Sequence, residues 1–147
     1  MCLINQGLKY QGSTRWKFVE FGQLLRGDIL GFMSPSFREF IWQKNNVSLN
    51  YLKGHSNFPN SQFGFHVFLF KQTAINAAKS WNGTQYSNND YFIFKLHCSN
   101  FIDGGIIDRC DEYSDGKRGE RWENAEVIGI FDIQGRDVTK TYEKYLL

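Results

Sequence analysis

The chain has 147 residues, 41 % of them hydrophobic and 17 % aromatic, and its 17 basic and 15 acidic side chains give a formal charge of +2. This length and apolar content predict one domain, residues 1–147, with a substantial core, and they exclude a disordered chain. The small charge argues neither for nor against nucleic acid. No apolar run approaches the ~18 residues of a membrane span and no signal-peptide pattern occurs, so we expect a cytoplasmic protein with no membrane partner.

Three cysteines, an odd number, occur without a Cys-x-x-Cys spacing. A disulfide framework and a structural zinc site both need more regular cysteine spacing, so we expect neither of them and no other metal site. Cys98 directly follows His97, but neighbours on a strand point to opposite faces. These two side chains are therefore not expected to form a catalytic pair.

The first third of the chain contains three predicted elements. Residues 8–11, bounded by glycines, are a candidate first strand. The pattern of residues 16–26 fits a helix or a strand, and the two alternatives stay open. Ser34 and Pro35 predict the start of a helix, with Ser as N-cap and Pro at the first helical position. The apolar face of that helix is expected to be Phe37, Phe40 and Ile41.

Residues 63–70 form a nearly unbroken apolar run, which predicts a strand buried on both faces. His66 is the only ionisable side chain in this run, either a functional imidazole or a core histidine bonded to a carbonyl. A helix is predicted to follow, with Thr73 as N-cap and Gly83 at its end. Its apolar face has helical spacing and consists of Ala74, Ala77, Ala78 and Trp81.

Residues 45–62 and 82–90 are rich in Asn and Ser and are predicted loops. Between them and the C-terminus, residues 91–98 predict a strand that is buried on one face and mixed on the other. One face is expected to carry Phe92, Phe94, Leu96 and Cys98, and the other Tyr91, Ile93, Lys95 and His97.

The C-terminal third alternates turns and strands. Residues 103–105, Asp-Gly-Gly, predict a turn, and the highly charged residues 108–123 predict a surface excursion. Residues 126–133 predict the last strand, and residues 134–136 turn it toward a closing hairpin. The tail, residues 142–147, is open between a helix and a strand. Together these elements predict an α+β fold with a mostly antiparallel sheet.

Several charged residues have two interpretations. Asp103 is either an active-site carboxylate at a strand end or an ordinary turn residue, and Glu120 and Glu123, on either side of Trp122, form a carboxylate site or a solvated loop. The nearby basic cluster is opposed by four acidic residues, so it is poorly suited to following a phosphate backbone. We therefore do not expect nucleic acid as a partner. The basic cluster consists of Lys117, Arg118 and Arg121.

Three segments together carry a resemblance to a known family. They are Tyr10-Gln-Gly-Ser13, residues 64–68 with the Ala-rich stretch after them, and residues 91–103 with the closing block 127–138. In this order they resemble the small ADP-ribosyltransferases, and the pattern is closest to the rifampin ADP-ribosyltransferases. The resemblance extends over about two-thirds of the chain. It implies a split, mostly antiparallel β-sheet core with a few short helices.

The resemblance also implies a function, which is to bind NAD in a central cleft and pass ADP-ribose to an acceptor. The cofactor would be bound by the first segment, where Gln11 replaces the family's histidine. His66 would lie near the position that stacks on nicotinamide. Asp103, or else Glu123, would stabilise the positive charge of an oxocarbenium-like transition state. The expected cofactor-binding residues are Tyr10, Gln11, Gly12 and Ser13, and the expected catalytic residues are His66 and Asp103.

An alternative is an inactive member of the same fold that binds a protein partner. Such a protein would be an inhibitor or adaptor, for example of a phage or mobile element, and would use exposed aromatic residues and the charged segment 108–123. The two hypotheses differ in one observable feature. An enzyme requires Gln11, His66 and Asp103 to converge on one open pocket, whereas a binding protein does not.

Overall fold

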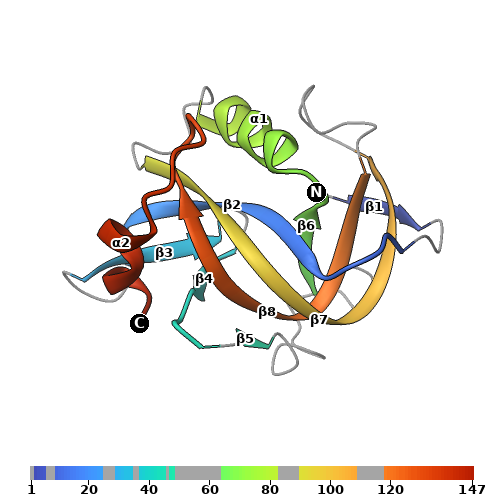
Figure 1. Cartoon of the computed structure of the whole chain (residues 1–147), viewed down its shortest axis with the longest axis horizontal. Coiled ribbons are helices and arrows are strands. Elements are labelled where there is room, and N and C mark those ends of the chain that lie inside the picture. Colours follow the sequence, from blue (N-terminus) through green and yellow to red (C-terminus); the bar gives the residue numbers. More distant parts are fainter. Residues whose placement is uncertain are drawn as a thin grey trace.

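Figure 1 shows a computed structural model of the chain, which describes residues 2–5, 9–24, 29–34, 37–45, 47–48, 64–82, 90–108 and 118–147. Antiparallel strands dominate it and two short α-helices accompany them, in agreement with the predicted α+β class. The strands are β1 (Cys2–Asn5), β2 (Thr14–Gln23), β3 (Leu30–Ser34), β4 (Phe37–Ile41), β5 (Val47–Ser48), β6 (Phe65–Phe68), β7 (Asp90–Asp108) and β8 (Arg118–Phe131). The helices are α1 (Lys71–Asn82), α2 (Thr139–Tyr142) and the 3₁₀-helix η3 (Glu143–Tyr145).

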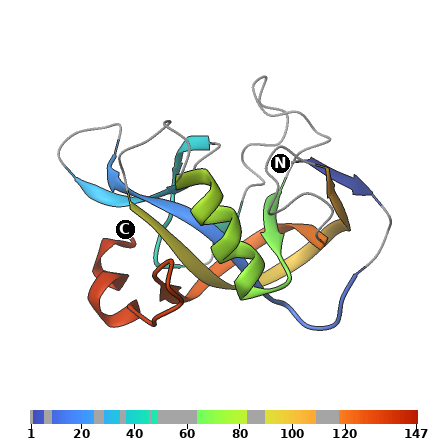
Figure 2. The same cartoon turned by 90° about the horizontal axis from the view of Figure 1, so that it is seen from above.

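Four strands pair in a closed ring. β2 pairs with β7, β7 with β8, β8 with β6, and β6 returns to β2 through the single residue pair Phe68 and Trp16. β7 and β8 form a long, strongly curved hairpin that contributes most of this ring (Figure 1). β3 and β4 extend the sheet beyond β2, while β1 adds to β7 and β5 to β8. Seen from above, α1 lies across one side of the sheet (Figure 2).

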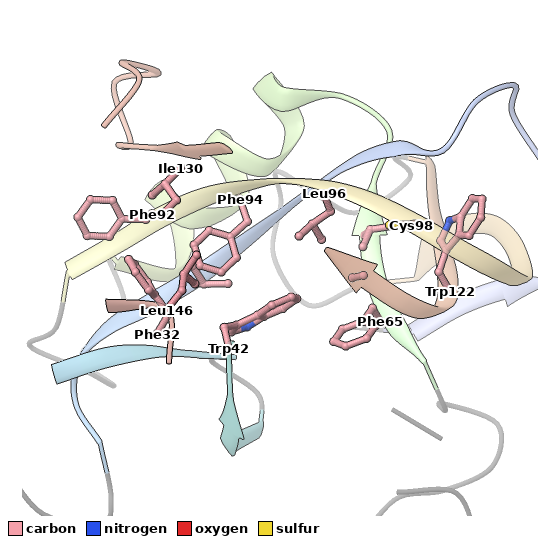
Figure 3. Close-up of a cluster of buried hydrophobic side chains, with 13 residues drawn as sticks. Phe32, Trp42, Phe65, Phe92, Phe94, Leu96, Cys98, Trp122, Ile130 and Leu146 are labelled. Carbon is pink, nitrogen blue, oxygen red and sulfur yellow. The ribbon is translucent and has the colours of Figure 1, made fainter. Parts of the chain in front are cut away.

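The two sides of β7 enter two different cores. The side that was predicted to be mixed holds the buried Tyr91 and Ile93 and the exposed His97. The larger core is mainly aromatic, and in Figure 3 the Trp42 ring lies between Phe65 and Phe94, at centroid distances of 5.1 and 5.2 Å. Aromatic pairs of this kind add about 0.5–1.5 kcal/mol beyond the area that they bury. The smaller core lies under α1 and includes Tyr91 and Ile93. The β7 side chains in the larger core are Phe92, Phe94, Leu96 and Cys98.

Helix α1 is confirmed together with its apolar face. Its three alanines are buried, which lets the helix approach the sheet closely, and Trp81 packs on Phe18 at 6.1 Å between centroids. The predicted N-cap is wrong, because the helix begins at Lys71 and Thr73 lies inside its first turn. The Ala74 amide donates to the Phe70 carbonyl at 3.3 Å, so the helix follows directly after the bend at residues 69–70 that ends β6. Gly83 lies outside the described residues.

Two predictions in the first third are wrong and one alternative is decided. Residues 9–11 are not a strand, because the Tyr10 and Gln11 carbonyls bond to the Arg15 side chain instead of to a neighbouring strand. Residues 14–23 form strand β2. The predicted helix after Ser34 is strand β4, and the Ser34 hydroxyl accepts from the Trp42 indole at 3.3 Å instead of capping a helix.

The C-terminal third is more regular than predicted. Residues 103–105 are not a turn but lie within β7, and residues 118–123 are not a surface excursion but lie within β8, since Gly105 pairs with Gly119 across the hairpin. The predicted last strand is the end of β8, and the turn is confirmed by Gly135, with φ of +88°. After one bridge from Phe131 to Asp137 the tail is helical. Within the predicted loop 45–62, Val47–Ser48 form strand β5 instead, and residues 46 and 49–62 lie outside the described residues. The same holds for residues 83–89 and 109–117 of the other predicted loops.

Candidate functional site

A buried ion pair organises the segment before β2. Arg15 and Glu120 are 3 % and 1 % exposed, and the Arg15 Nε donates to the Glu120 carboxylate. Glu120 also accepts from the Tyr10 backbone amide at 3.1 Å and from the Trp122 indole at 3.0 Å. The rest of the Arg15 guanidinium donates to four backbone carbonyls, those of Thr14, Tyr10, Gln11 and Gly12.

The residues expected to bind NAD therefore form a bend whose carbonyls are held by the Arg15 side chain. Tyr10, Gln11 and Gly12 are exposed, and Gly12 has φ of +81°. The Ser13 carbonyl accepts from the Cys98 amide at 2.8 Å, which fixes the end of the bend to β7. Burial raises the pKa of the Cys98 thiol to about 12, with Glu120 adding to the rise, so Cys98 remains a protonated core residue.

The two expected catalytic residues lie in one row across three strands. His66 on β6 is the register partner of Arg121 on β8, and Arg121 is the partner of Asp103 on β7. Directly opposed residues point to the same face of an antiparallel sheet, so these three side chains lie on one side. Arg121 donates to both Asp103 oxygens, from Nε at 2.8 Å and from Nη2. Asp103 is thus neutralised by a nearly buried arginine, their side chains being 14 % and 7 % exposed.

His66 has the most strongly perturbed environment of this row. Burial, together with the nearby positive charges of Lys17 and Arg121, lowers the pKa of its imidazole to about 3. The ring is therefore neutral at physiological pH, and its buried Nε2 has no hydrogen-bond partner. The Lys17 ammonium donates to the His66 carbonyl at 2.9 Å, and burial lowers the pKa of Lys17 to about 8.

The predicted residues do not converge on one site. Glu120 and Arg121 are neighbours on β8 and point to opposite faces, so the Gln11 segment is tied to one face while His66 and Asp103 lie on the other. Glu123 is near Asn100, whose amide lies 3.5 Å from its carboxylate. Sequence reasoning did not identify Arg15 or Arg121 as the groups that hold these residues. Arg121 lies in the segment predicted to be a charged surface excursion, and Arg15 lies between two predicted elements, so neither gave a local signal.

A surface pocket of about 410 Å³ lies at the opposite end of β8, and all its lining residues are described. It is formed where the start of β7, the turn after β8 and helix α2 meet. Its aromatic wall includes Phe92 and Tyr142, whose ring centroids are 4.5 Å apart. The lining residues are Asp90, Tyr91, Phe92, Asp132, Ile133, Gln134, Arg136, Val138 and Tyr142.

The polar wall of this pocket is set by Asp132. Its Oδ1 accepts from the Gln134 and Arg136 amides at 3.0 and 2.9 Å, and its Oδ2 accepts from the Arg136 Nε at 2.8 Å. Partial burial alone would raise its pKa, but the Arg136 hydrogen bonds outweigh this and hold the pKa below the usual value. Asp132 is therefore a fixed, ionised carboxylate. The Arg136 side chain is 75 % exposed.

No three His, Cys, Asp or Glu side chains gather as metal ligands anywhere in the described ranges. Of the helices described, none is long and apolar enough to cross a membrane. Comparison of the chain with protein-family models, with curated proteins and with solved structures finds no match.

Proposed function

We propose that the protein is a binding domain that engages a polypeptide partner through one end of the sheet. This end face consists of the pocket and three exposed apolar residues, Ile29, Leu30 and Leu147, whose exposed fractions are 53, 44 and 53 %. Ile29 and Leu30 lie at the start of β3, and Leu147 follows η3, which packs against β3. Both views place the C-terminal helices beside this end of β3 (Figures 1 and 2).

The pocket and the apolar residues are connected through one aromatic cluster. Phe21 packs on Tyr142 at 5.5 Å and on Tyr145 at 5.0 Å between centroids. Phe21 also pairs with Asp90 at the pocket, and two residues further along β2 Gln23 pairs with Leu30. Exposed apolar side chains around an aromatic pocket with a charged rim are typical of protein interfaces. This continuity is the observation that supports the proposal.

The test compares the proteins that are captured by matched surface variants. A double variant, Ile29→Ser with Leu30→Ser, removes apolar area from the end face without opening the core. A partner on this face is supported if a captured protein is lost with this variant but is still captured by a control. The control is a variant in which another exposed apolar residue is changed to serine. The proposal fails if the double variant, folded by circular dichroism, captures the same proteins as the natural chain.

Ile128→Ser is a suitable control. Ile128 is 47 % exposed but belongs to a bulge of β8, level with Trp16 on β2. Leu30 is level with Gln23, seven residues further along β2. At about 3.3 Å per residue, the two surfaces are separated by roughly 23 Å. A partner lost with both variants would therefore indicate a general loss of folding or solubility instead of a specific face.

NAD binding, with transfer of ADP-ribose, is a second candidate function. One observation favours it, which is that His66 and Asp103 lie in the same row beside Arg121. In this proposal the neutral imidazole stacks on the nicotinamide ring, and Asp103 exchanges Arg121 for a ribose hydroxyl. The bond that holds Asp103 to Arg121 and the separation of Gln11 from this row make it the weaker of the two proposals.

Thermal unfolding tests this second candidate directly. NAD at about a hundredfold over its dissociation constant should raise the free energy of unfolding by about 2.7 kcal/mol. The shift caused by NAD, measured against each protein's own baseline, should disappear in Asp103→Asn. Absence of any shift with NAD, ADP-ribose or cyclic nucleotides would exclude the nucleotide proposal.

A further inference from the structure

We propose that the pocket of the end face takes an arginine side chain of the partner polypeptide, an inference that rests on the proposed binding function. The pocket combines the two groups that recognise a guanidinium ion. Aromatic rings offer their faces to its plane, and carboxylates accept its forked N–H groups. The partly buried Tyr142 offers such a ring, with Phe92 packed against it at 4.5 Å between centroids, whereas the Tyr91 ring belongs to the core under α1. The carboxylates are Asp90 and Asp132.

The chain already places one guanidinium on this carboxylate. The Arg136 Nε donates to the Asp132 Oδ2, while two backbone amides hold the Oδ1 in place. Asp132 is therefore oriented for a guanidinium before any partner arrives. Because Arg136 is 75 % exposed, the pair is of the kind that contributes little to stability. An incoming arginine can displace Arg136 at small cost and take over the Oδ2.

The charge of the lining favours a cation over an anion. Asp90 and Asp132 oppose the single positive charge of Arg136, which is bound to Asp132. When Arg136 moves out to solvent, a ligand cation meets two carboxylates. An anion would instead meet those carboxylates with only Arg136 to attract it. Lysine carries the same charge as arginine but presents neither a plane for the rings nor a fork for the carboxylate, so it should bind more weakly.

The experiment titrates the full chain with three short peptides of the form acetyl-Gly-X-Gly-amide and measures binding by calorimetry and by backbone amide chemical shifts. X is arginine, lysine or citrulline, the last being a neutral analogue of arginine with the same shape. We expect the arginine peptide to bind and to shift the amides of residues 132–138, the lysine peptide to bind less tightly, and the citrulline peptide not to bind. Equal binding of arginine and citrulline peptides would overturn the inference.

Variants of the two members of the pair should act in opposite directions. Asp132→Asn keeps an oxygen for the two backbone amides but loses the charge, and should weaken binding of the arginine peptide about tenfold. Arg136→Ala removes the competing side chain and should strengthen binding about two- to fivefold, the range that corresponds to an exposed ion pair. Glu126→Gln removes an exposed carboxylate of β8 outside the pocket and should change nothing.

Two further results with variants of the pocket test the inference itself. Asp90→Asn should also weaken binding of the arginine peptide. This variant keeps the test decisive if Asp132→Asn fails to fold. If Arg136→Ala weakens binding, Arg136 itself contacts the ligand and the inference is overturned.

Two other results separate this inference from the proposed function. If partner capture depends on Ile29 and Leu30 while no arginine peptide binds, the arginine inference fails alone. If the peptide binds while the Ile29→Ser and Leu30→Ser variant keeps every partner, the proposed function fails alone, because the apolar residues of the end face then contact no partner.

Discussion

The molecule uses the same chemistry, an arginine paired with a carboxylate, in two opposite settings. Between the strands of the ring, Arg15 and Glu120 have side chains that are 4 % and 1 % exposed. At the end face, Arg136 and Asp132 have side chains that are 75 % and 15 % exposed. The first pair joins residues 105 positions apart in the chain, and the second joins residues four apart.

This difference determines what each pair can do. Removal of one partner from a buried pair leaves an uncompensated charge away from water, so the pair must remain intact and serves the fold. An exposed pair exchanges readily with solvent or with a ligand. Asp103 belongs to the first class, because Arg121 holds both of its oxygens in a nearly buried setting. The residue types that suggest chemistry in the sequence therefore serve mainly as structural links in this part of the molecule.

The largest expected effect comes from breaking the buried pair. Glu120→Ala should lower the free energy of unfolding by about 3–5 kcal/mol, because it leaves the Arg15 charge buried and removes the acceptor of the Tyr10 amide and the Trp122 indole. Urea denaturation, with the slope of the transition checked for constancy, measures this loss. Glu126→Ala, an exposed carboxylate on the same strand, should stay within about 0.5 kcal/mol of the natural chain. Equal losses in the two variants would contradict the contrast.

Two glycines extend the comparison to the backbone. Gly64 precedes β6 with φ of +108°, and a Cβ there would lie 2.5 Å from the Ile102 Cδ1 and 3.0 Å from the Trp122 carbonyl oxygen. Gly64→Ala should therefore cost about 2–4 kcal/mol, from backbone strain and displacement of neighbours. Gly12 has φ of +81° but nothing within 4 Å, so Gly12→Ala should cost about 1 kcal/mol from strain alone. Thermal and urea unfolding of both variants measure the two losses of stability. A larger loss in Gly12→Ala than in Gly64→Ala would contradict this prediction.

His66 gives a smaller effect that depends on pH. Its pKa is about 3 in the folded protein and near the ordinary value of 6.5 in the unfolded chain, so only the unfolded chain takes up a proton between these values. The contribution of His66 to stability is thus complete above pH 6.5 and declines as the pH falls toward 3, by about 1.4 kcal/mol per pH unit. His66→Phe should remove this slope. Urea unfolding of both proteins at pH 6 and pH 5 measures the difference, and equal slopes would be incompatible with a depressed pKa.

Local patterns predicted the elements that depend on neighbouring residues. The alternation of residues 91–98, the alanine face of α1 and the Gly135 turn are all set within a few positions of the chain, and the structure confirms each of them. Ser34 and Pro35 predicted a helix over residues 37–41, and this was wrong because the pairing of Met33 with Ile41 makes them a strand. That pairing is a tertiary contact, which no local pattern contains.

The sites were less predictable for the same reason. Residues 118–123 resemble a solvated charged loop, because the partner that permits Glu120 to be buried lies 105 residues away. The placement of His66 and Asp103 on either side of Arg121 depends on the register of three strands. The pocket is formed by side chains from β7, the turn after β8 and α2. Only Asp132 left a local signal, since an Asp three residues before a turn glycine can accept hydrogen bonds from the turn amides.

The smallest effect is expected for the exposed pair of Arg136 and Asp132, whose loss is compared with that of the buried pair. Arg136→Ala should lower the free energy of unfolding by less than about 0.5 kcal/mol, because an exposed pair four residues apart adds little and the Arg136 backbone amide still bonds to Asp132. Urea denaturation of Arg136→Ala and Glu120→Ala under the same conditions compares the two losses in the free energy of unfolding. A loss above about 1.5 kcal/mol would show that the pair holds the turn together. In that case an incoming guanidinium would have to break the turn to enter the pocket.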